Sequence, residues 1–221
     1  ALAEADDADA AARGAGASLE GRLRVSAPVT FARLHLVPRL GDILAAHPRL
    51  RLEVVLDDRV IDPLADRIDV AFRLGALTDS ALLVRKLAEG ERLLVASPAY
   101  LARRGAPITP AALGEHDAVV YGQEVGGEEW RFSRGSEEVV VRLQGRLLLS
   151  AAEGVRAAVL AGLGVAVVSR WMMAPELSRG EVLPLLPGWS LSPIDLWAVY
   201  PAGRLTSAKA QAFVRWFERL I

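Results

Sequence analysis

The feature that most constrains the fold is a regular alternation of strand-like and helix-like patterns. Short apolar runs typical of strands occur at Leu23–Ala27, Leu50–Leu56 and Asp69–Leu74. Helical patterns separate these runs, the first over residues 31–44 and the second at Ile61–Arg67. This β-α-β-α-β order predicts a parallel sheet whose crossover connections are right-handed.

The first helical pattern has apolar residues spaced three, three, three and four apart, which places them on one helix face: Phe31, Leu34, Val37, Leu40 and Leu44. Pro38 lies inside the pattern, so we expect it to kink the helix or to begin a second segment. A His47-Pro48 pair ends the stretch. We expect the His47 side chain to cap carbonyl groups at this helix end.

The second half of the chain repeats these patterns. Leu82–Leu87 and Arg92–Ser97 predict two more strands. A short helix is expected from Pro98 to Arg103, and another opens at Pro110, because proline is favoured at the first position of a helix. Asp117–Tyr121 predicts the next strand.

A local antiparallel excursion is expected next, from apolar runs at Trp130–Phe132, Val139–Leu143 and Arg146–Leu149. The segment Ser150-Ala151-Ala152-Glu153 then has the spacing of a capping box, which predicts that a helix begins there. Behind it, apolar residues recur at helical spacing up to Gly162, which we expect to end the helix.

The last part of the chain continues the alternation. Val165–Val168 predicts a buried strand and Pro193–Tyr200 a final one. A closing helix from about Ser207 has an apolar face made of Phe213, Trp216, Phe217 and Leu220. The two halves are similar in kind and no Gly/Ser-rich linker separates them, so the sequence predicts two α/β lobes between which strands cross.

The first residues differ in composition from the rest. Ala1–Arg13 is mostly alanine with four acidic residues, which favours a helix that Gly14 and Gly16 would end. This segment has almost no apolar stripe. Two interpretations stay open: a frayed terminus, or the tail of a longer helix whose remainder lies upstream.

The composition excludes several classes of protein. Hydrophobic residues make up 52% of the 221, yet no uncharged apolar run approaches the roughly 20 residues that a membrane-spanning helix needs. The chain has no cysteine, which rules out disulfides and thiolate metal sites and fits a reducing cytoplasm. A net charge of −1 argues against nucleic-acid binding by these residues themselves.

Signatures of catalysis and of cofactor binding are missing. There is no phosphate-binding loop and no nucleophile elbow, and the three histidines, His35, His47 and His116, have no metal-ligand spacing. Asp57-Asp58 could be an acid–base pair, but neighbours on a strand point to opposite faces, so solvation in a loop is favoured. The sequence therefore predicts no enzyme, no metal and no cofactor.

Polar side chains follow many of the predicted strands: Ser26–Thr30, Asp57–Arg59, Ser97, Tyr121–Gln123, Ser150 and Ser169. In open α/β sheets, ligands bind at the carboxyl ends of strands. Helix N-termini expected near Val29 and Ala151 would present amides that suit a carboxylate or phosphate. Helix capping explains each residue singly, whereas the set as a whole predicts a cleft between the lobes that binds an anionic small ligand near Thr30 and Ser150.

Several motifs then occur in the order that one protein family uses. They are R-V-S-A-P-V-T-F (Arg24–Phe31), L-V-P-R-L (Leu36–Leu40), His47-Pro48, D-V-A-F-R-L-G (Asp69–Gly75), A-S-P-A-Y-L (Ala96–Leu101) and A-V-L-A-G-L-G-V-A-V-V (Ala158–Val168). In these motifs the chain resembles the effector-binding domain of LysR-type transcriptional regulators, in the subgroup whose first strand reads R-V-S-A-P. The resemblance covers residues 21–221.

The resemblance implies an α/β fold of two Rossmann-like subdomains hinged by two crossing strands, similar to type 2 periplasmic binding proteins. The crossings would fall near Arg92–Ser97 and Asp195–Tyr200. The chain would then divide into three parts: the tail of a linker helix (1–20), subdomain I (21–95 with 197–221) and subdomain II (96–196).

The resemblance also implies a small-molecule effector in the cleft. It would contact these positions: Pro28, Val29, Thr30, Asp57, Arg73, Ser97, Tyr121, Ser150 and Ala151. Many members of the subgroup have two asparagines where this chain has Ala151-Ala152. Without these side-chain amides the site has fewer hydrogen-bonding groups, so the identity of a relative's effector cannot be assigned to this chain.

For a regulator of this kind, the resemblance implies a cytoplasmic homodimer, or a tetramer in the full-length protein, that responds allosterically to its effector. DNA would be contacted only through a winged helix-turn-helix upstream of these residues, and no membrane is involved. Residues 1–16 would then be the tail of the connecting helix. We expect self-association through Phe31–Ala46 and Leu50–Leu56, packed against helices of a partner's other lobe.

Two other classes stay open. An extracytoplasmic solute-binding protein of a transporter would share the fold, and fold alone cannot separate it from a regulator. A helix-turn-helix or a signal peptide upstream in the intact gene would decide between them. An enzyme on this scaffold would need an acid, base or nucleophile that the sequence does not show, and turnover of a candidate ligand would reveal it.

Overall fold

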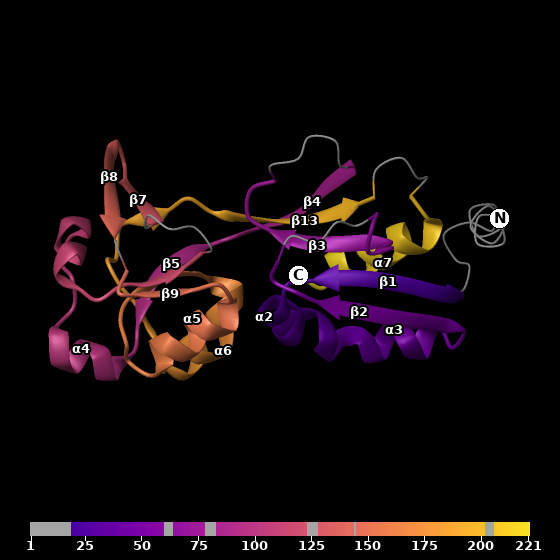
Figure 1. Cartoon of the computed structure of the whole chain (residues 1–221), viewed down its shortest axis with the longest axis horizontal. Coiled ribbons are helices and arrows are strands. Elements are labelled where there is room, and N and C mark those ends of the chain that lie inside the picture. The colour runs from indigo at the N-terminus through magenta and orange to yellow at the C-terminus, as the bar shows by residue number, and fades with distance from the viewer. Residues whose placement is uncertain (1–18, 60–63, 78–82, 123–127, 144, 202–205) are drawn as a thin grey trace. The chain divides into compact units, whose positions relative to one another are not determined.

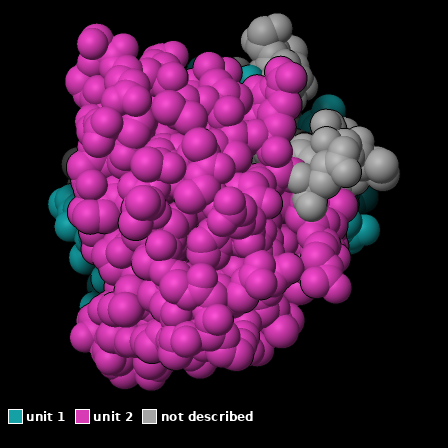
Figure 2. Space-filling model, turned by 90° about the vertical axis from the view of Figure 1, so that its left-hand side faces the viewer, with its two compact units in different colours: residues 1–88, 195–221 teal, residues 89–194 magenta. Residues whose placement is uncertain are grey.

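The computed structural model describes residues 19–59, 64–77, 83–122, 128–143, 145–201 and 206–221 (Figure 1). The chain divides into two units, unit 1 from residues 1–88 with 195–221 and unit 2 from residues 89–194 (Figure 2). It passes into unit 2 within strand β4 (Leu83–Gly90) and returns at the start of β13 (Ile194–Tyr200). The domain limits predicted from the sequence, 21–95 with 197–221 and 96–196, stay a prediction.

Unit 1 is built on a five-stranded sheet with the order β2-β1-β3-β13-β4 (Figure 1). Strand β1 (Gly21–Ala27) pairs in parallel with β2 (Leu50–Leu56) and with β3 (Val70–Leu74), which confirms the predicted parallel arrangement. β13 runs antiparallel to β3. Because β1, β2 and β3 run the same way, their carboxyl ends lie at one edge of the sheet, here called the carboxyl edge of unit 1.

Helices α2 (Val29–Phe31) and α7 (Ala208–Glu218) cover the same face of this sheet. Phe217 of α7 contacts Phe72 of β3, with ring centroids 4.9 Å apart, and meets Phe31 of α2 edge to face at 6.0 Å. All three rings are buried. Helix α7 begins where the sequence predicts, since the Ser207 hydroxyl accepts the N–H of Ala210 at 3.1 Å. The aromatic core therefore joins α2 to α7.

The helical stretch that follows β1 is irregular. After α2 come a π turn over Ala32–Leu36 and a 3₁₀ turn over Val37–Arg39, and then α3 (Leu40–Ala46). The 3₁₀ turn contains Pro38, so the expected break in the helix is confirmed. A π turn has i→i+5 hydrogen bonds and a 3₁₀ turn i→i+3, and these two changes of pitch rotate the face that meets the sheet.

This rotation overturns part of the predicted apolar face. Phe31 is buried as expected, but Val37 and Leu44 are 45% and 39% exposed. Leu36 and Ile43, one residue earlier in each case, are buried in their place. The regular 3.6-residue spacing assumed from the sequence is therefore wrong beyond the first turn, and it leaves two large apolar side chains on the surface.

Two other expectations for unit 1 differ from the structure. The described part of the predicted helix Ile61–Arg67 is a turn over Leu64–Arg67, in which the Arg67 N–H donates to the Leu64 carbonyl at 3.2 Å. Arg67 has a left-handed φ of 53°, which a helix does not allow. Residues 61–63 of that helix and the helix predicted for Ala1–Arg13 lie outside the described residues.

The expected cap by His47 is also wrong. In the described residues, His47 Nδ1 accepts a hydrogen bond from the N–H of Leu19 at 3.1 Å. A nitrogen that accepts carries no hydrogen, so the neutral ring carries its proton on Nε2. The side chain therefore fastens Leu19, two residues before β1, to the end of α3.

Unit 2 contains a sheet in which β5 (Arg92–Ala96) lies between β10 (Ala166–Ser169) and β11 (Leu183–Pro184), antiparallel to both. A parallel bridge pairs Ala118, directly before β6 (Val119–Tyr121), with Val165, directly before β10, so these two strands run the same way. Helix α4 (Pro98–Arg104) follows β5 as predicted, whereas the helix expected at Pro110 is a 3₁₀ turn over Pro110–Glu115.

The antiparallel excursion is only partly as expected. Strands β7 (Glu128–Arg134) and β8 (Glu137–Leu143) form an antiparallel pair, with β12 (Ser190–Leu191) added beside β7. Arg146–Leu149 was expected to belong to it, but β9 (Leu147–Leu149) pairs in parallel with β6 (Val119–Tyr121). A three-residue apolar run does not specify its partner, because pairing depends on where the chain returns to the sheet.

The central sheet of unit 2 is buried on both faces, as its continuous apolar runs predict. In β5, Leu94 and Ala96 belong to a core that includes Trp130 and Phe132 of β7. The residue between them, Val95, belongs to a second core with α5 (Ala152–Leu160) and α6 (Arg170–Arg179). Alternate side chains of one strand thus enter two different cores.

The predicted capping box at the start of α5 is not formed. The helix begins after Ala151, and no side chain among the described residues caps it there. Ser150 is exposed and lies one position too early, while Glu153 pairs with Arg156 at 2.8 Å. The helix does end before Gly162, whose φ of 72° suits glycine.

The sequence patterns predict no helix where α6 lies. The signals that could have identified it are the Ser169 hydroxyl, which accepts the N–H of Met172 at 3.2 Å, and Gly180, whose φ is 70°. Pro175 inside the helix interrupts the pattern. None of the helices in the described residues has both the length and the apolar character needed to cross a membrane.

Candidate functional site

The turn Pro28-Val29-Thr30 lies at the carboxyl edge of unit 1, between β1 and α2. Pro28 has an extended backbone and Thr30 is buried. The N–H of Val29 donates to Asp58 Oδ1 at 2.9 Å, so a carboxylate from the loop after β2 satisfies the first amide of this helix. The expectation that this amide is available to an anionic ligand is therefore wrong, because the chain's own Asp58 holds it.

Asp57 lies beside Asp58 and has a different partner. Its carboxylate accepts hydrogen bonds from the backbone N–H of Arg59 at 2.9 Å and from the Arg59 guanidinium at 2.8 Å. The side-chain bond from Arg59, then its backbone bond, and the charges of Arg59 and Arg73 lower the pKa of Asp57 to about 2. Solvation in a loop, the role expected for this pair, is replaced by two defined sets of contacts.

Arg73 extends this group from the neighbouring strand β3. Its Nη1 donates to the carbonyl of Arg59 at 3.1 Å. Partial burial lowers the pKa of Arg73, and the nearby Asp57 carboxylate opposes that shift. Since the N–H of Asp57 also donates to the carbonyl of Ala27, at 3.2 Å, the ends of β1, β2 and β3 are linked. The structure thus brings together all five site residues predicted for unit 1: Pro28, Val29, Thr30, Asp57 and Arg73.

Ser26, in the last part of β1, has a feature that these residues lack. It is 0% exposed, and within the described residues its hydroxyl makes no hydrogen bond. A buried hydroxyl without a partner costs about 1–3 kcal/mol. Ser26 and Pro28 are two residues apart along extended backbone, which places both side chains on the same side of β1. The sequence shows Ser26 only as one polar residue among several, because burial cannot be read from residue type.

In unit 2, Tyr121 and Ser150 end two neighbouring strands. Tyr121 of β6 is level with Leu149 of β9, and the N–H of Gly122 donates to the Leu149 carbonyl at 3.1 Å. Because β6 and β9 are parallel, Tyr121, Ser150 and Ala151 lie at the same edge of the sheet, and all three are exposed. This part of the predicted site is therefore assembled within unit 2.

Ser97 lies elsewhere in unit 2. It follows β5, which runs antiparallel to β10, so that Val95 is level with Ala166 and Arg92 with Ser169. The strands β10 and β6 run the same way, because the residues directly before them, Val165 and Ala118, pair in parallel. Since β5 runs antiparallel to β10, its end lies at the edge of the sheet opposite to Tyr121. The assumption that all these residues follow strands of one direction fails for Ser97. Its hydroxyl is buried and has no partner in the described residues.

Sequence reasoning missed the contacts of two residues at the carboxyl edge of unit 1, Asp58 and Arg59. The available signal was an acidic pair followed directly by arginine at the end of a predicted strand. Their contacts link positions far apart in the chain, and single-sequence patterns do not report such pairs. In the described part of the chain, no three His, Cys, Asp or Glu side chains gather in a way that could hold a metal ion.

Comparison with known proteins gives consistent matches. Residues 16–220 match the family described as LysR substrate binding domain. The HTH-type transcriptional regulator PtxR of Pseudomonas aeruginosa is 32% identical over 213 residues, which are 96% of this chain and 68% of that protein. The uncharacterized HTH-type transcriptional regulator YhjC of Escherichia coli is 34% identical over 201 residues, 90% of this chain and 67% of that protein.

Two solved structures agree with the sequence matches. The full-length Vibrio cholerae virulence activator AphB, described as a member of the LTTR protein family, superposes with a TM-score of 0.75 and 26% identity, covering 99% of this chain and 74% of that chain. The regulatory domain of CrgA, a LysR-type transcriptional regulator from Neisseria meningitidis, has a TM-score of 0.80 at 23% identity. That match covers 92% of this chain and 100% of the other and shows the shared fold.

Proposed function

This chain belongs to the LysR family of transcriptional regulators as an effector-binding domain, and we propose that it binds a small-molecule effector at the carboxyl edge of unit 1. The alternative expected from the sequence, a solute-binding protein of a transporter, is not favoured, because the relatives are named as transcriptional regulators.

The unpartnered hydroxyl of Ser26 is the observation that carries this site. A ligand atom that hydrogen-bonds this hydroxyl would remove its desolvation cost. The half-buried Arg73 lies at the same edge and keeps its positive charge beside Asp57. An anionic effector remains our prediction, and it now rests on Arg73 rather than on the amide of Val29.

A thermal-shift screen with small carboxylates, and with neutral compounds of the same size, tests the site. We expect carboxylates to raise the melting temperature of the parent domain. Ser26→Ala should fold with equal or greater stability, because it removes a buried hydroxyl without a partner, yet bind the best hit about tenfold more weakly because one hydrogen bond is lost.

The control is Ser178→Ala, since Ser178 is an exposed serine of α6. It should leave the affinity unchanged. Equal affinity of Ser26→Ala and the parent would refute the site at Ser26. If neutral compounds raise the melting temperature and no carboxylate does, the effector is not an anion.

The contacts from unit 2 remain predictions. Tyr121, Ser150 and Ala151 lie at one edge and are exposed, so we propose that the effector contacts them, whereas the position of Ser97 at the opposite edge argues against including it. Effector binding would favour one of two conformations and so change how the helix-turn-helix module of the regulator meets DNA. We propose no turnover of the effector and no cofactor, and we place this regulator in the cytoplasm.

We also propose that the domain forms a homodimer through α3 and β2 of unit 1. Strand β2 is an edge strand of the described sheet, and Leu56 at its end is exposed. Val37 and Leu44 add exposed apolar surface along the helical stretch beside it. Exposed edges and apolar patches of this kind are sites of association.

A charge in this surface should weaken the dimer. We expect Leu44→Glu to raise the dimer dissociation constant at least tenfold, because a carboxylate would be desolvated in the interface. Sedimentation velocity over a range of concentrations measures the change. Leu83→Glu is the control, since Leu83 is an exposed leucine on β4, the other edge strand of the sheet. A parent domain that stays monomeric at high concentration would contradict the proposal.

A further inference from the structure

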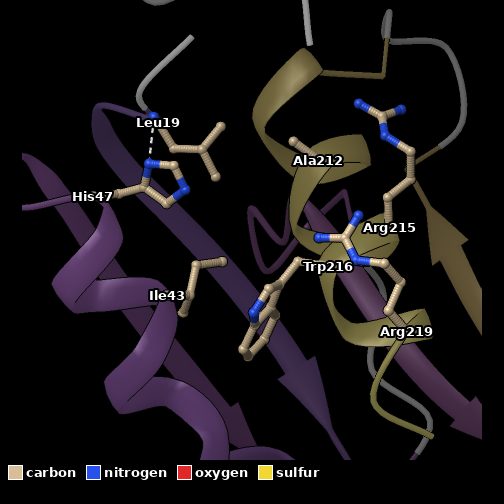
Figure 3. A pocket seen from close by; sticks show the side chains of 7 residues that line it. All are labelled: Leu19, Ile43, His47, Ala212, Arg215, Trp216 and Arg219. Carbon is tan, nitrogen blue, oxygen red and sulfur yellow. Dashed lines mark hydrogen bonds between the residues drawn. The ribbon is translucent and has the colours of Figure 1, made fainter. Parts of the chain in front are cut away.

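A hollow of about 340 Å³ lies on unit 1 between α3, α7 and Leu19, two residues before β1 (Figure 3). Its lining includes Leu19, Ile43, His47, Arg215, Trp216 and Arg219. Leu19 comes just before β1 and His47 just before β2, so the hollow is at the amino edge of the sheet. It is therefore separate from the effector site proposed above, and its volume falls within the roughly 300–1,000 Å³ of small-molecule pockets.

The walls of this hollow are largely apolar. Ile43 of α3 and Trp216 of α7 face each other across it (Figure 3). Ile43 is buried. The Trp216 ring packs against Phe213, with centroids 5.3 Å apart, and against Phe217 at 6.2 Å. The buried aromatic core thus holds the indole in place, and its remaining surface is available to a flat apolar group.

Hydrogen-bond donors border the same space. His47 Nδ1 accepts from the N–H of Leu19, so Nε2 carries the proton, and Nε2 is on the side of the ring that faces the hollow (Figure 3). The Arg219 guanidinium extends back toward Trp216, whereas that of Arg215 points away (Figure 3). Among the described residues, no acidic side chain forms an ion pair with Arg219. The described residues that line the hollow therefore offer a cation and a neutral donor and no negative charge.

We propose that this hollow binds a small carboxylate with a flat apolar body, such as an aromatic acid. Arg219 and the Nε2–H of His47 would bind the carboxylate, because an arginine–carboxylate contact is a strong charge-assisted hydrogen bond. Ile43 and Trp216 would contact the body. The ligand would also touch Leu19 and so stabilise the hydrogen bond between its N–H and His47, at the point where the chain enters β1.

Arg219 has another explanation that needs no ligand. It lies at the C-terminal end of α7, where a cation interacts favourably with the helix dipole. That role requires neither an adjacent apolar wall nor a donor from a different helix. It also predicts no dependence of ligand binding on Arg219, so an experiment separates the two explanations.

The test uses the 221-residue domain with benzoate as the probe. Benzamide supplies the same ring without charge, and inorganic phosphate supplies an anion without an apolar body. We expect benzoate to change tryptophan fluorescence in a saturable way, and we expect this change to be lost in Trp216→Phe, which keeps the other four tryptophans. Calorimetry should show benzoate binding at least tenfold more weakly to Arg219→Gln.

Two controls separate this site from the effector site and from a general charge effect. Arg51→Gln removes an exposed arginine of β2 outside the hollow and should leave the affinity unchanged. Ser26→Ala is the other control, because weaker benzoate binding in this variant would place the probe at the effector site and not in the hollow. Hydrogen exchange of the Leu19 amide should slow when benzoate binds to the parent domain.

Three results would overturn the proposal. Equal binding of benzamide would show that the charge is not recognised, and equal binding of phosphate would show that the apolar walls are not used. Unchanged benzoate affinity in Arg219→Gln would leave the helix dipole as the role of this arginine. Arg219 is exposed, so the unfolding midpoint of the variant should match that of the parent and confirm that it is folded.

Discussion

Glu176→Gln should lower the free energy of unfolding by about 3 kcal/mol, because it removes the buried partner of two arginines. Glu176 of α6 is 1% exposed and binds Arg156 of α5 through both carboxylate oxygens. The same carboxylate accepts a bond from Arg179 at 3.1 Å. The Arg156 side chain is only 14% exposed, so loss of the carboxylate leaves a charge that water cannot fully solvate.

Chemical denaturation measures this change, and Glu181→Gln is the matched control. Glu181 also pairs with Arg179, at 2.7 Å, but both of those side chains are about half exposed, so we expect little change in stability. Equal effects of the two substitutions would show that burial of Glu176 does not matter. Burial lowers the pKa of Arg156, but its contacts with Glu176 and then Glu153 outweigh this and raise it, so Arg156 stays charged at every pH of such an experiment.

This ion-pair network also bears on the predicted effector contacts. It fastens α5 to α6, and α5 begins directly after Ser150 and Ala151. No side chain in the described residues caps that helix start. We infer that the contacts of Arg156 with Glu153 and Glu176 hold the first turns of α5 in place.

Phe217→Ala should cost about 3–5 kcal/mol of unfolding free energy, the range for deleting a buried phenylalanine side chain. Phe217 is 0% exposed and contacts the rings of Phe31, Phe72 and Trp216. Its loss removes apolar contacts and leaves a cavity between α7, α2 and β3. Phe31 follows Thr30 directly, so we also expect weaker effector binding in the part of the population that stays folded.

Leu220→Ala is the control for this substitution. Leu220 comes three residues later and is exposed, so we expect a change in stability within about 0.5 kcal/mol. The same denaturation experiment measures both variants. A loss of less than about 1 kcal/mol in Phe217→Ala would mean that the surrounding rings collapse into the space, and it would contradict a tightly packed core.

Most of the unit 1 part of the candidate site was predictable because it depends on strand direction. Once β1, β2 and β3 are parallel, residues after their ends must lie at one edge, and Pro28–Thr30 and Asp57 do so. Arg73 lies within β3, and only the resemblance to the family predicted it as a site residue. Ser97 shows the limit of this reasoning. An apolar run predicts a strand in either direction, and β5 runs antiparallel to its neighbours.

The contacts within the site were not predictable in the same way. Asp58 satisfies the amide of Val29 across 29 positions of sequence. The sequence indicates a helix start at Val29 and an acidic pair at Asp57-Asp58, but it does not show that the two are in contact. Whether the two meet depends on the path of the backbone after β2, and that path changes the interpretation from an available anion site to one that the chain itself occupies.

The amino-acid sequence by itself determined the α/β class, the parallel pairing of β1, β2 and β3, the family and the absence of disulfides, because periodicity, strand order, motifs and composition are properties of the chain itself. Only the tertiary structure decided which side chains are buried, which helix face meets the sheet and which charges find partners. The physical reason is that burial and pairing depend on contacts between distant segments. Nothing in the sequence distinguishes the residues concerned. Their surroundings alone leave the hydroxyl of Ser26 without a partner, expose the apolar side chains of Val37 and Leu44, and bury the charge of Glu176.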